Sequence, residues 1–341
     1  MNDKFIKKYS SMTGSSNTAY IEKLLPLIEE IKELKKKHNA VVLSHYYMTP
    51  ELQIEEKEGG IADFVGDSLG LSVAATKTDA DYIVFCGVKF MAETAFILNP
   101  KKTVLLPDDD AGCSLAESIT GDDVIKLKSK YPGIPVIAYI NTYAETKAEC
   151  DVCCTSRNAI KIAKSFESKE LIFIPDQFMG QNLAVKFATE TDKKLILWSG
   201  TCEVHEQFRT NIESLTLANP GAELLLHWEV PQETVESTLK NNKGIVGSTS
   251  DILNYVENSK SREFILGSEC DLGATLKGMY PDRQFITPCI MCRHMKLITL
   301  QKTLDALRSI NTETEIKYKI KVDEPVLSKA YIPIKRMLDL S

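Results

Sequence analysis

Apolar and polar positions along the chain alternate with two different periods. Residues 21–39 carry apolar side chains at helical spacing and have a basic end, which predicts an amphipathic helix. After this helix, short runs of β-branched and apolar residues alternate with longer helical stretches. Such alternation is typical of a parallel α/β fold. We expect residues 1–20 to form a loose lead.

The expected strands fall into three sets of four. The runs are 41–47, 62–68, 82–87 and 103–108; then 135–142, 151–156, 171–176 and 195–200; then 224–229, 244–250, 264–269 and 285–289. The weakest of them, 62–68, could instead begin a helix. Four strand-like runs therefore recur three times along the chain.

A cysteine follows each set of strands. Cys113, Cys202 and Cys292 are separated by 89 and 90 residues, and the sets of strands recur at the same interval. Because nine cysteines offer many triples, coincidence is the alternative. The shared interval favours three similar α/β units. Each cysteine also precedes a helix-like stretch, whose first N–H groups would stabilise a thiolate.

The charge balance and the cysteine count limit the function classes. A net charge of −6 disfavours a general role in binding nucleic acid or membrane surfaces. The lysines near the start have no apolar stretch behind them, and no run approaches the length of a membrane span. We therefore expect a cytoplasmic protein, in which nine cysteines favour metal or catalytic chemistry over disulfide bonds.

Cys289 and Cys292 form a Cys-x-x-Cys motif that fits zinc, a redox dithiol or an iron–sulfur cluster. A second pair, Cys150 and Cys153, is separated from it by 135 residues, which is too far for a zinc ribbon. Three cysteines from three units would suit a cluster with one iron open to substrate. The other cysteines are expected to be small buried apolar residues: Cys86, Cys150, Cys153, Cys154 and Cys270.

Polar side chains are frequent where the expected strands end. Loops after strands are commonly polar, so a single serine or threonine there says little. The histidines say more, because the chain has only five and His45, His205 and His227 lie at or just after strand ends. In parallel sheets, ligands gather at these ends. The polar positions are His45, Tyr47, Ser68, Tyr139, Asn141, Ser156, His227, Glu229, Ser248 and Thr249.

Long segments of the chain resemble the quinolinate synthase family, the iron–sulfur enzymes of NAD biosynthesis. They include "LSHYYMTPELQ" (43–53), "ADFVGDSLGLS" (62–72) and "CRHMKLITL" (292–300). Further segments in the same order lie at 86–117, 139–159, 174–184, 197–208 and 246–250. The chain departs from the family at Ser199, Trp228 and Arg293, where proline is usual.

The resemblance implies an α/β fold with three similar three-layer α/β/α domains, parallel sheets and a pseudo-threefold arrangement around a central active site. The implied boundaries are a lead at 1–20, domains at 21–120, 121–212 and 213–302, and a C-terminal helix and tail at 303–341 that pack back on the body. A central [4Fe–4S] cluster would be bound by one cysteine of each domain, namely Cys113, Cys202 and Cys292. Cys289 would be a spectator or would form a reversible disulfide with Cys292.

The implied reaction is a transferase reaction in which iminoaspartate condenses with dihydroxyacetone phosphate. Phosphate and water leave, the ring of quinolinate closes, and the open iron acts as a Lewis acid. The implied partners are these two substrates, the aspartate-oxidising enzyme upstream and the iron–sulfur assembly machinery, with no nucleic acid and no membrane. The catalytic residues would be Tyr47, His227 and Glu229. The substrate-binding residues would be His45, Ser68, Tyr139, Asn141, Ser156, His227, Glu229 and Thr249.

Two other interpretations stay open at this point. One is a different [4Fe–4S] hydro-lyase that uses the same open iron. The other is a non-catalytic cluster protein such as a redox sensor or an electron carrier, although a carrier needs four protein ligands. A zinc-binding structural protein is a more distant alternative. Metal content separates zinc from iron, and product formation separates an enzyme from a sensor.

Overall fold

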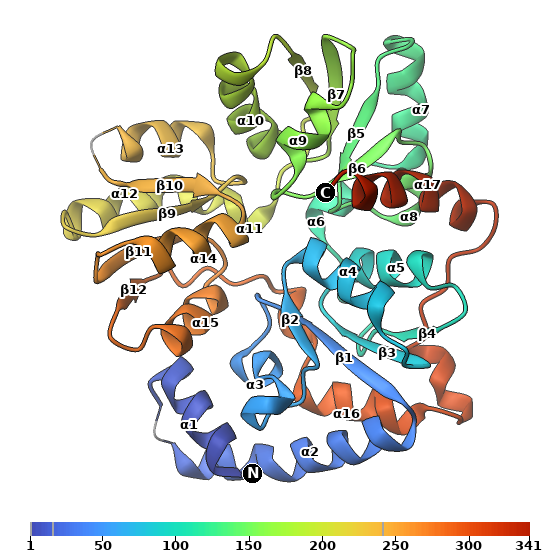
Figure 1. Cartoon of the computed structure of the whole chain (residues 1–341), viewed down its shortest axis with the longest axis vertical. Coiled ribbons are helices and arrows are strands. Elements are labelled where there is room, and N and C mark those ends of the chain that lie inside the picture. Colours follow the sequence, from blue (N-terminus) through green and yellow to red (C-terminus); the bar gives the residue numbers. More distant parts are fainter. Residues whose placement is uncertain (1, 16, 241) are drawn as a thin grey trace. The chain divides into compact units, whose positions relative to one another are not determined.

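The computed structural model describes residues 2–15, 17–240 and 242–341. In this part of the chain, twelve strands form three parallel four-stranded sheets with helices around them (Figure 1). The α/β class and the three similar sheets are thereby confirmed. By contacts the chain divides into two compact units. Unit 1 comprises Met1–Gly112, Glu269–Gln284 and Met291–Lys321, and unit 2 comprises Cys113–Ser268, Phe285–Ile290 and Val322–Ser341.

All three sheets have the same strand order. The first sheet runs β2 (Phe64–Gly66), β1 (Ala40–His45), β3 (Tyr82–Cys86), β4 (Thr103–Leu105). The second runs β6 (Val152–Cys154), β5 (Val136–Tyr139), β7 (Glu170–Ile174), β8 (Lys194–Leu197), and the third runs β10 (Gly244–Gly247), β9 (Glu223–His227), β11 (Glu263–Gly267), β12 (Gln284–Ile286). In each sheet the first strand of the set lies in the interior. The second strand pairs with it on one side, and the third strand pairs with it on the other side. This change of direction places a topological switch point beside the first strand.

The central strands are apolar because helices cover both faces of each sheet. Every residue of β5 is buried, and so are all but one residue each of β1 and β9. Such strands read as continuous apolar runs instead of alternating ones. This burial explains why the sequence predicts the central strands. The outer strands β2, β8, β10 and β12 are less buried, yet all twelve strands lie within three residues of their expected bounds. The weakest expected strand, 62–68, is a three-residue strand followed at once by a helix.

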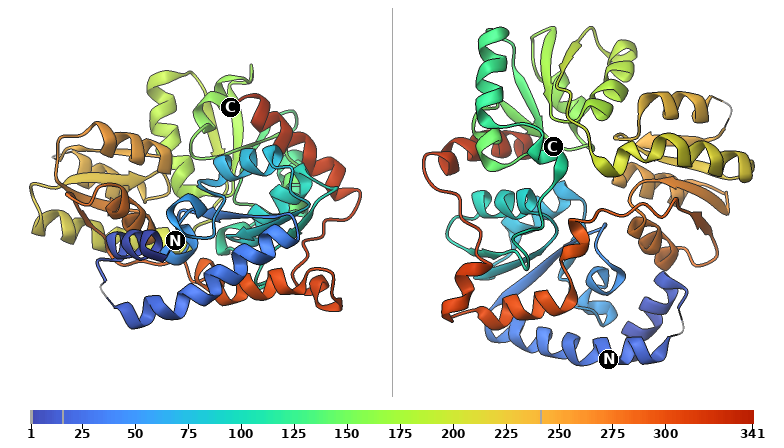
Figure 2. Two further views of the ribbon diagram at one scale, coloured as in Figure 1. Left: turned by 60° about the horizontal axis from the view of Figure 1, so that its bottom comes forward. Right: turned by 180° about the vertical axis from the view of Figure 1, so that it is seen from behind.

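In unit 1 the helices lie on both faces of the first sheet. α2 (Thr18–Lys37) and α16 (Leu300–Ser309) lie side by side on one face, with α4 (Ser68–Lys77) and α5 (Lys89–Leu98) on the other (Figures 1 and 2). The shorter helices of unit 1 are α3 (Pro50–Gln53), η1 (Glu56–Glu58), η2 (Met295–Leu297) and η3 (Glu313–Lys317). α2 confirms the amphipathic helix expected at 21–39.

The expected loose lead instead contains a helix, α1 (Asn2–Thr13). Phe5, Tyr9 and Met12 are buried on one side of it, and α1 packs against α15 (Asp271–Met279) within unit 1. The prediction missed α1 because lysines and serines dilute its apolar positions. Its fourth-residue spacing is nevertheless visible in the sequence.

Unit 2 contains the second and third sheets. Its longer helices are α7 (Gly121–Lys130), α10 (Gln177–Glu190), α12 (Phe208–Ala218), α13 (Gln232–Leu239), α14 (Thr249–Asn258) and α17 (Val326–Asp339). Its shorter helices are α6 (Ser114–Glu117), α8 (Ala144–Ala148), α9 (Ala159–Lys164) and α11 (Glu203–Glu206). The C-terminal α17 packs against α8 and β6 of this unit. The domain boundaries given above stay a prediction.

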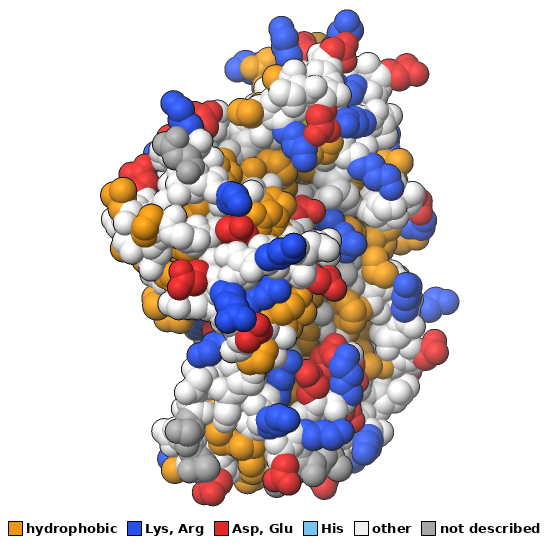
Figure 3. All heavy atoms as spheres, turned by 60° about the vertical axis from the view of Figure 1, so that its left-hand side comes forward, with side chains coloured by type: hydrophobic (Ala, Val, Ile, Leu, Met, Phe, Trp, Pro, Cys, Tyr) orange, Lys and Arg blue, Asp and Glu red, His pale blue; other side chains and the backbone are white. Residues whose placement is uncertain are grey.

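The surface carries both signs of charge (Figure 3), as expected from a sequence with 41 basic and 47 acidic residues. Positive and negative side chains intermingle on the face drawn in Figure 3. Among the described helices, none combines the length and the apolarity that crossing a bilayer requires.

Candidate functional site

The predicted substrate residues occupy equivalent places in the three sheets. The first strand of each sheet ends in one of them, and another follows two residues later. The strand-end residues are His45, Tyr139 and His227, and the later ones are Tyr47, Asn141 and Glu229. The strand order reverses beside the first strand of each sheet. All six residues therefore lie close to the switch point of their own sheet, which is where α/β sheets bind ligands.

The remaining predicted residues also recur at equivalent points. After the second strand of each sheet come Ser68, Ser156 and Thr249, and after the fourth come Cys113, Cys202 and Cys292. Ser68 and Thr249 are the first residues of α4 and α14. Unit 1 thus holds His45, Tyr47, Ser68 and Cys292, and unit 2 holds the other predicted site residues.

Cys113 and Cys202 lie near one another in unit 2, each directly before a short helix. Burial raises the pKa of the Cys202 thiol well above its usual value, and negative charge on Cys113 and Glu229 raises it further. The backbone N–H groups of Val204 and His205 point at the same sulfur and act in the opposite direction. The site therefore brings three acidic groups together and provides hydrogen-bond donors for a thiolate.

The two cysteine segments of unit 2 are fastened together. The indole Nε1 of Trp198 donates a hydrogen bond to the carbonyl of Ser118, at the end of α6, over 3.0 Å. Gly200 lies so close that a Cβ there would be 2.3 Å from Ser118 Oγ and 2.5 Å from Pro175 O. Only glycine allows this approach, which sets the position of the loop two residues before Cys202.

Glu229 lies at the centre of a buried cluster in unit 2. Its Oε2 is 3.0 Å from Nε2 of His205 and 2.9 Å from Nδ1 of His227. Its Oε1 has no hydrogen-bond partner among the described residues. Burial alone would raise the pKa of Glu229, but the two imidazoles outweigh it and hold the pKa well below its usual value. Both ring nitrogens lie within ion-pair distance of Oε2, although neither makes a hydrogen bond within the described part of the chain.

The backbone around Glu229 is fixed from α10. The side-chain amide of Asn182 donates to the carbonyls of Trp228 and Val230, each over 2.7 Å. The indole of Trp228, which stands where the family usually has proline, is buried and lies under the ammonium of Lys186. Packing and these two hydrogen bonds thus hold the strand end that proline would otherwise stiffen.

Asp176 lies just after β7 and is completely buried. Its Oδ1 accepts the N–H of Met179 and caps α10, while its Oδ2 has no hydrogen-bond partner in the described chain. Burial and the neighbouring Glu229 carboxylate raise the pKa of Asp176 from its usual value near 4 to about 8. Asp176 is therefore protonated in the folded protein at neutral pH.

We expect Asp176→Asn to change how stability depends on pH. Between pH 4 and about 8, Asp176 is protonated in the folded protein but ionised in the unfolded chain. The free energy of unfolding therefore falls as pH rises through this window. Asparagine keeps the cap and removes that fall. Relative to wild type, the variant should gain about 1 kcal/mol per pH unit across the window and level off above it. Urea unfolding of metal-free protein checks this, and parallel curves would contradict it.

In unit 1, His45 and Tyr47 face one another at the end of β1. Their rings meet edge to face, with centroids 4.6 Å apart, and the N–H of Tyr47 donates to Nδ1 of His45 over 3.2 Å. Cys292 belongs to the same unit, and the N–H groups of His294 and Met295 point at its sulfur. Burial raises the pKa of the Cys292 thiol despite these donors.

The nine cysteines differ in accessibility. None of the nine, all of which the structure describes, is in a disulfide bond. The three predicted ligands, Cys113, Cys202 and Cys292, are half-buried. Four of the five cysteines expected in the core are buried, whereas Cys270 is half-buried, and Cys289 is exposed. Accessible thiols with N–H donors on two of the sulfurs are a donor set that fits a [4Fe–4S] cluster.

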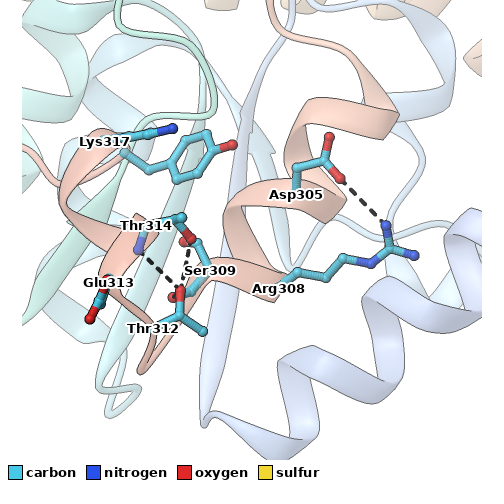
Figure 4. A pocket seen from close by; sticks show the side chains of 8 residues that line it. Asp305, Arg308, Ser309, Thr312, Glu313, Thr314 and Lys317 are labelled. Carbon is cyan, nitrogen blue, oxygen red and sulfur yellow. Dashed lines mark hydrogen bonds and ion pairs between the residues drawn. The ribbon is translucent and has the colours of Figure 1, made fainter.

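A hollow of about 570 Å³ in unit 1 lies apart from these residues in the sequence and contains none of them (Figure 4). Its polar groups serve the local fold. Arg308 binds both carboxylate oxygens of Glu30 over 2.7 Å, and Thr312 Oγ1 donates to the Ser309 carbonyl over 2.6 Å. The lining residues are Asp305, Arg308, Ser309, Thr312, Glu313, Thr314, Lys317 and Tyr318.

Three buried polar residues lie beside predicted site residues of their own unit but are not among the predicted ones. His205 was noted at a strand end but was given no role. Asp176 and Glu269 each follow the third strand of their sheet by two residues. A carboxylate two residues after a strand that is buried beyond its first residue is a signal that could identify both, since ligands gather at the carboxyl ends of strands.

A model of the family described as quinolinate synthetase A protein matches residues 29–339. The chain belongs to this family. It is 45% identical over 320 residues to the quinolinate synthase of Caulobacter vibrioides strain NA1000, a match that covers 92% of the chain and 82% of that protein. Identity is 44% to the quinolinate synthase of Sinorhizobium fredii, over 92% of the chain and 82% of that protein. It is 42% to quinolinate synthase 2 of Mesorhizobium japonicum, over 91% and 90%.

Proposed function

We propose that the chain is a quinolinate synthase of NAD biosynthesis that condenses iminoaspartate with dihydroxyacetone phosphate. The family match over residues 29–339 carries this proposal, because it includes every predicted site residue. The half-buried cysteines and the placement of the polar residues at sheet switch points support it. A [4Fe–4S] cluster bound by Cys113, Cys202 and Cys292 would supply a Lewis-acid iron open to substrate.

The polar residues at the strand ends suit the anionic substrates. Iminoaspartate carries two carboxylates and dihydroxyacetone phosphate carries a phosphate. Ser68 and Thr249 offer hydroxyls at the first positions of ten-residue helices, where backbone N–H groups also favour anions. Tyr139, Asn141 and Ser156 add neutral donors. They can hold these groups without placing further negative charge beside Cys202 and Glu229.

His227 is the strongest candidate for moving protons. Glu229 Oε2 lies 2.9 Å from Nδ1 of His227, so a proton on Nδ1 would face the carboxylate and leave Nε2 to accept one from the substrate. The low pKa of Glu229 keeps this carboxylate charged, so it can stabilise the imidazolium that forms. Tyr47 offers a phenol as the second proton-transfer group, with its ring held against His45.

Anaerobically purified protein tests the proposal directly. We expect about four iron and four sulfide per chain, a brown spectrum, and quinolinate formed from the two substrates. Removal of iron with a chelator should abolish product and reconstitution should restore it. Zinc in place of iron, with no quinolinate, would overturn the assignment. A cluster without product would instead indicate a sensor or another hydro-lyase.

A further inference from the structure

Lys296 joins three segments of unit 1. Its ammonium lies 2.7 Å from Glu269 Oε1, contacts Asp271 Oδ2, and donates to the carbonyl of Tyr47 over 2.6 Å. Its side chain is only 19% exposed, and that of Glu269 is 1% exposed. Two carboxylates and one carbonyl thus surround a cation that is largely shielded from water, so these contacts are worth more than surface ion pairs.

Glu269 connects this cation to the Cys292 segment. Its Oε1 accepts the N–H of Cys292 over 3.3 Å, and its Oε2 accepts the N–H of Asp271 over 2.8 Å. One carboxylate oxygen therefore serves both Lys296 and the backbone of Cys292. Lys296 lies four residues after Cys292, and its N–H donates to the Cys292 carbonyl over 3.2 Å. The turn that follows the cysteine is closed by backbone and side chain together.

The Tyr47 segment is held at three successive carbonyls. Lys296 binds the carbonyl of Tyr47, and the amide of Gln53 binds those of Tyr46 and Met48. The same Gln53 amide also reaches the carbonyl of Asp271 over 3.3 Å. Both the Tyr47 segment and the start of α15 are therefore held by Lys296 and Gln53, and Lys296 supplies positive charge to these contacts.

The other two cysteine segments are fastened differently. In the first sheet the N–H of Lys89 donates to the carbonyl of Ala111, two residues before Cys113, over 2.8 Å. In the second sheet the N–H of Gln177 donates to the carbonyl of Gly200, two residues before Cys202, over 2.8 Å. Those two anchors are main-chain bonds, and in the Cys202 segment the indole of Trp198 adds one neutral side-chain hydrogen bond. At Cys292, charged side chains contribute directly to the anchor.

We propose that Lys296 is a positioning residue that ties the Cys292 segment to the Tyr47 segment through Glu269, so that holding the cluster and placing Tyr47 depend on one ammonium group. This inference rests on the proposed function for its cluster. Residues that orient metal ligands commonly change metal affinity or activity 10- to 100-fold when they are replaced. Lys296 acts on a ligand and on a substrate residue at once.

The test compares Lys296→Met with Lys296→Arg and wild type in full-length protein. After anaerobic reconstitution, the rate of iron release to a ferrous chelator should rise about 10- to 100-fold in Lys296→Met. Lys296→Arg, which keeps the charge, should recover most of the difference. In metal-free protein, hydrogen exchange of the amides of residues 46–48 should become about tenfold faster in Lys296→Met.

Lys35→Met is a matched control in the same unit. The Lys35 ammonium also binds two carboxylates, Glu56 and Asp63, each at 2.8 Å, and a carbonyl, that of Ile61. It should lower stability as much as Lys296→Met, yet leave iron release and exchange at residues 46–48 within about threefold of wild type. Equal rates in Lys296→Met and Lys35→Met would overturn the inference. A wild-type protein that takes up no iron would overturn the proposed function. In that case hydrogen exchange at residues 46–48 would still test whether Lys296 holds the Tyr47 segment.

Discussion

Cys202→Ala is expected to remove both the cluster and quinolinate formation. Cys202 would be one of three thiolate ligands. Its sulfur accepts hydrogen bonds from the N–H groups of Val204 and His205, and alanine has no acceptor in its place. Without an electrophilic iron, the loss of activity should be at least about 10³-fold. Cys113→Ala and Cys292→Ala should behave in the same way. Iron and sulfide content, the visible spectrum and quinolinate production measure the effect.

Cys270→Ala is the matched control for these variants. Cys270 is half-buried and directly precedes a helix, α15, as Cys113 and Cys202 precede α6 and α11. We expect Cys270→Ala to keep iron and activity. Cys289 is exposed, and Cys289→Ala should also keep both. If Cys289→Ala lost the cluster while Cys292→Ala kept it, the third ligand would have to be moved. Retention in all three ligand variants would remove the cluster from this site altogether.

Glu229→Gln should lower kcat about 10²- to 10⁴-fold while iron content stays at the wild-type level. The amide removes the negative charge next to Nδ1 of His227 and Nε2 of His205. It also leaves one ring free to take the wrong tautomer, since an amide can present either oxygen or NH₂. Steady-state kinetics with a metal assay on the same sample separate this effect from cluster loss.

Glu223→Gln provides the comparison within the same strand. Glu223 begins β9, whereas His227 ends it, and Glu223 Oε2 accepts a hydrogen bond from Ser259 over 2.6 Å. Its replacement should leave kcat within about threefold, because the amino end of a parallel strand lies away from the ligand edge. A Glu229→Gln enzyme with wild-type kcat would show that His227 does not depend on this carboxylate.

The regular part of the fold could be predicted because burial on two faces marks the strands. β5 and β9 are apolar over nearly their whole length, so neither depends on recognising an alternating pattern. His45 and Cys113 could be proposed as site residues because His45 ends β1 and Cys113 follows β4. The family resemblance then specified their roles, which remain predictions.

The polar contacts behind the site were beyond prediction, because they join residues far apart in the sequence. Glu229 meets His205 and Asp176 from other strand ends of unit 2, and neither distance nor burial is encoded by local spacing. In the sequence Lys296 is indistinguishable from other lysines of polar turns. Only the structure shows that its ammonium binds the carbonyl of Tyr47. α1 is hard to predict because lysines and serines interrupt its apolar positions, and the helix that it packs against, α15, lies about 260 residues later.

The position of α16 has a consequence for synthesis on the ribosome. The first sheet is complete in sequence at Leu105, yet one face depends on α16, whose Leu304 and Leu307 are fully buried against it. At ordinary translation rates, on the order of 10 to 40 s pass between the emergence of β4 and that of α16. During that interval the part of this face beside α2 that α16 later covers stays exposed. Expression at lower temperature or with added chaperone should therefore raise the yield of folded protein more than a change of codon usage near the start.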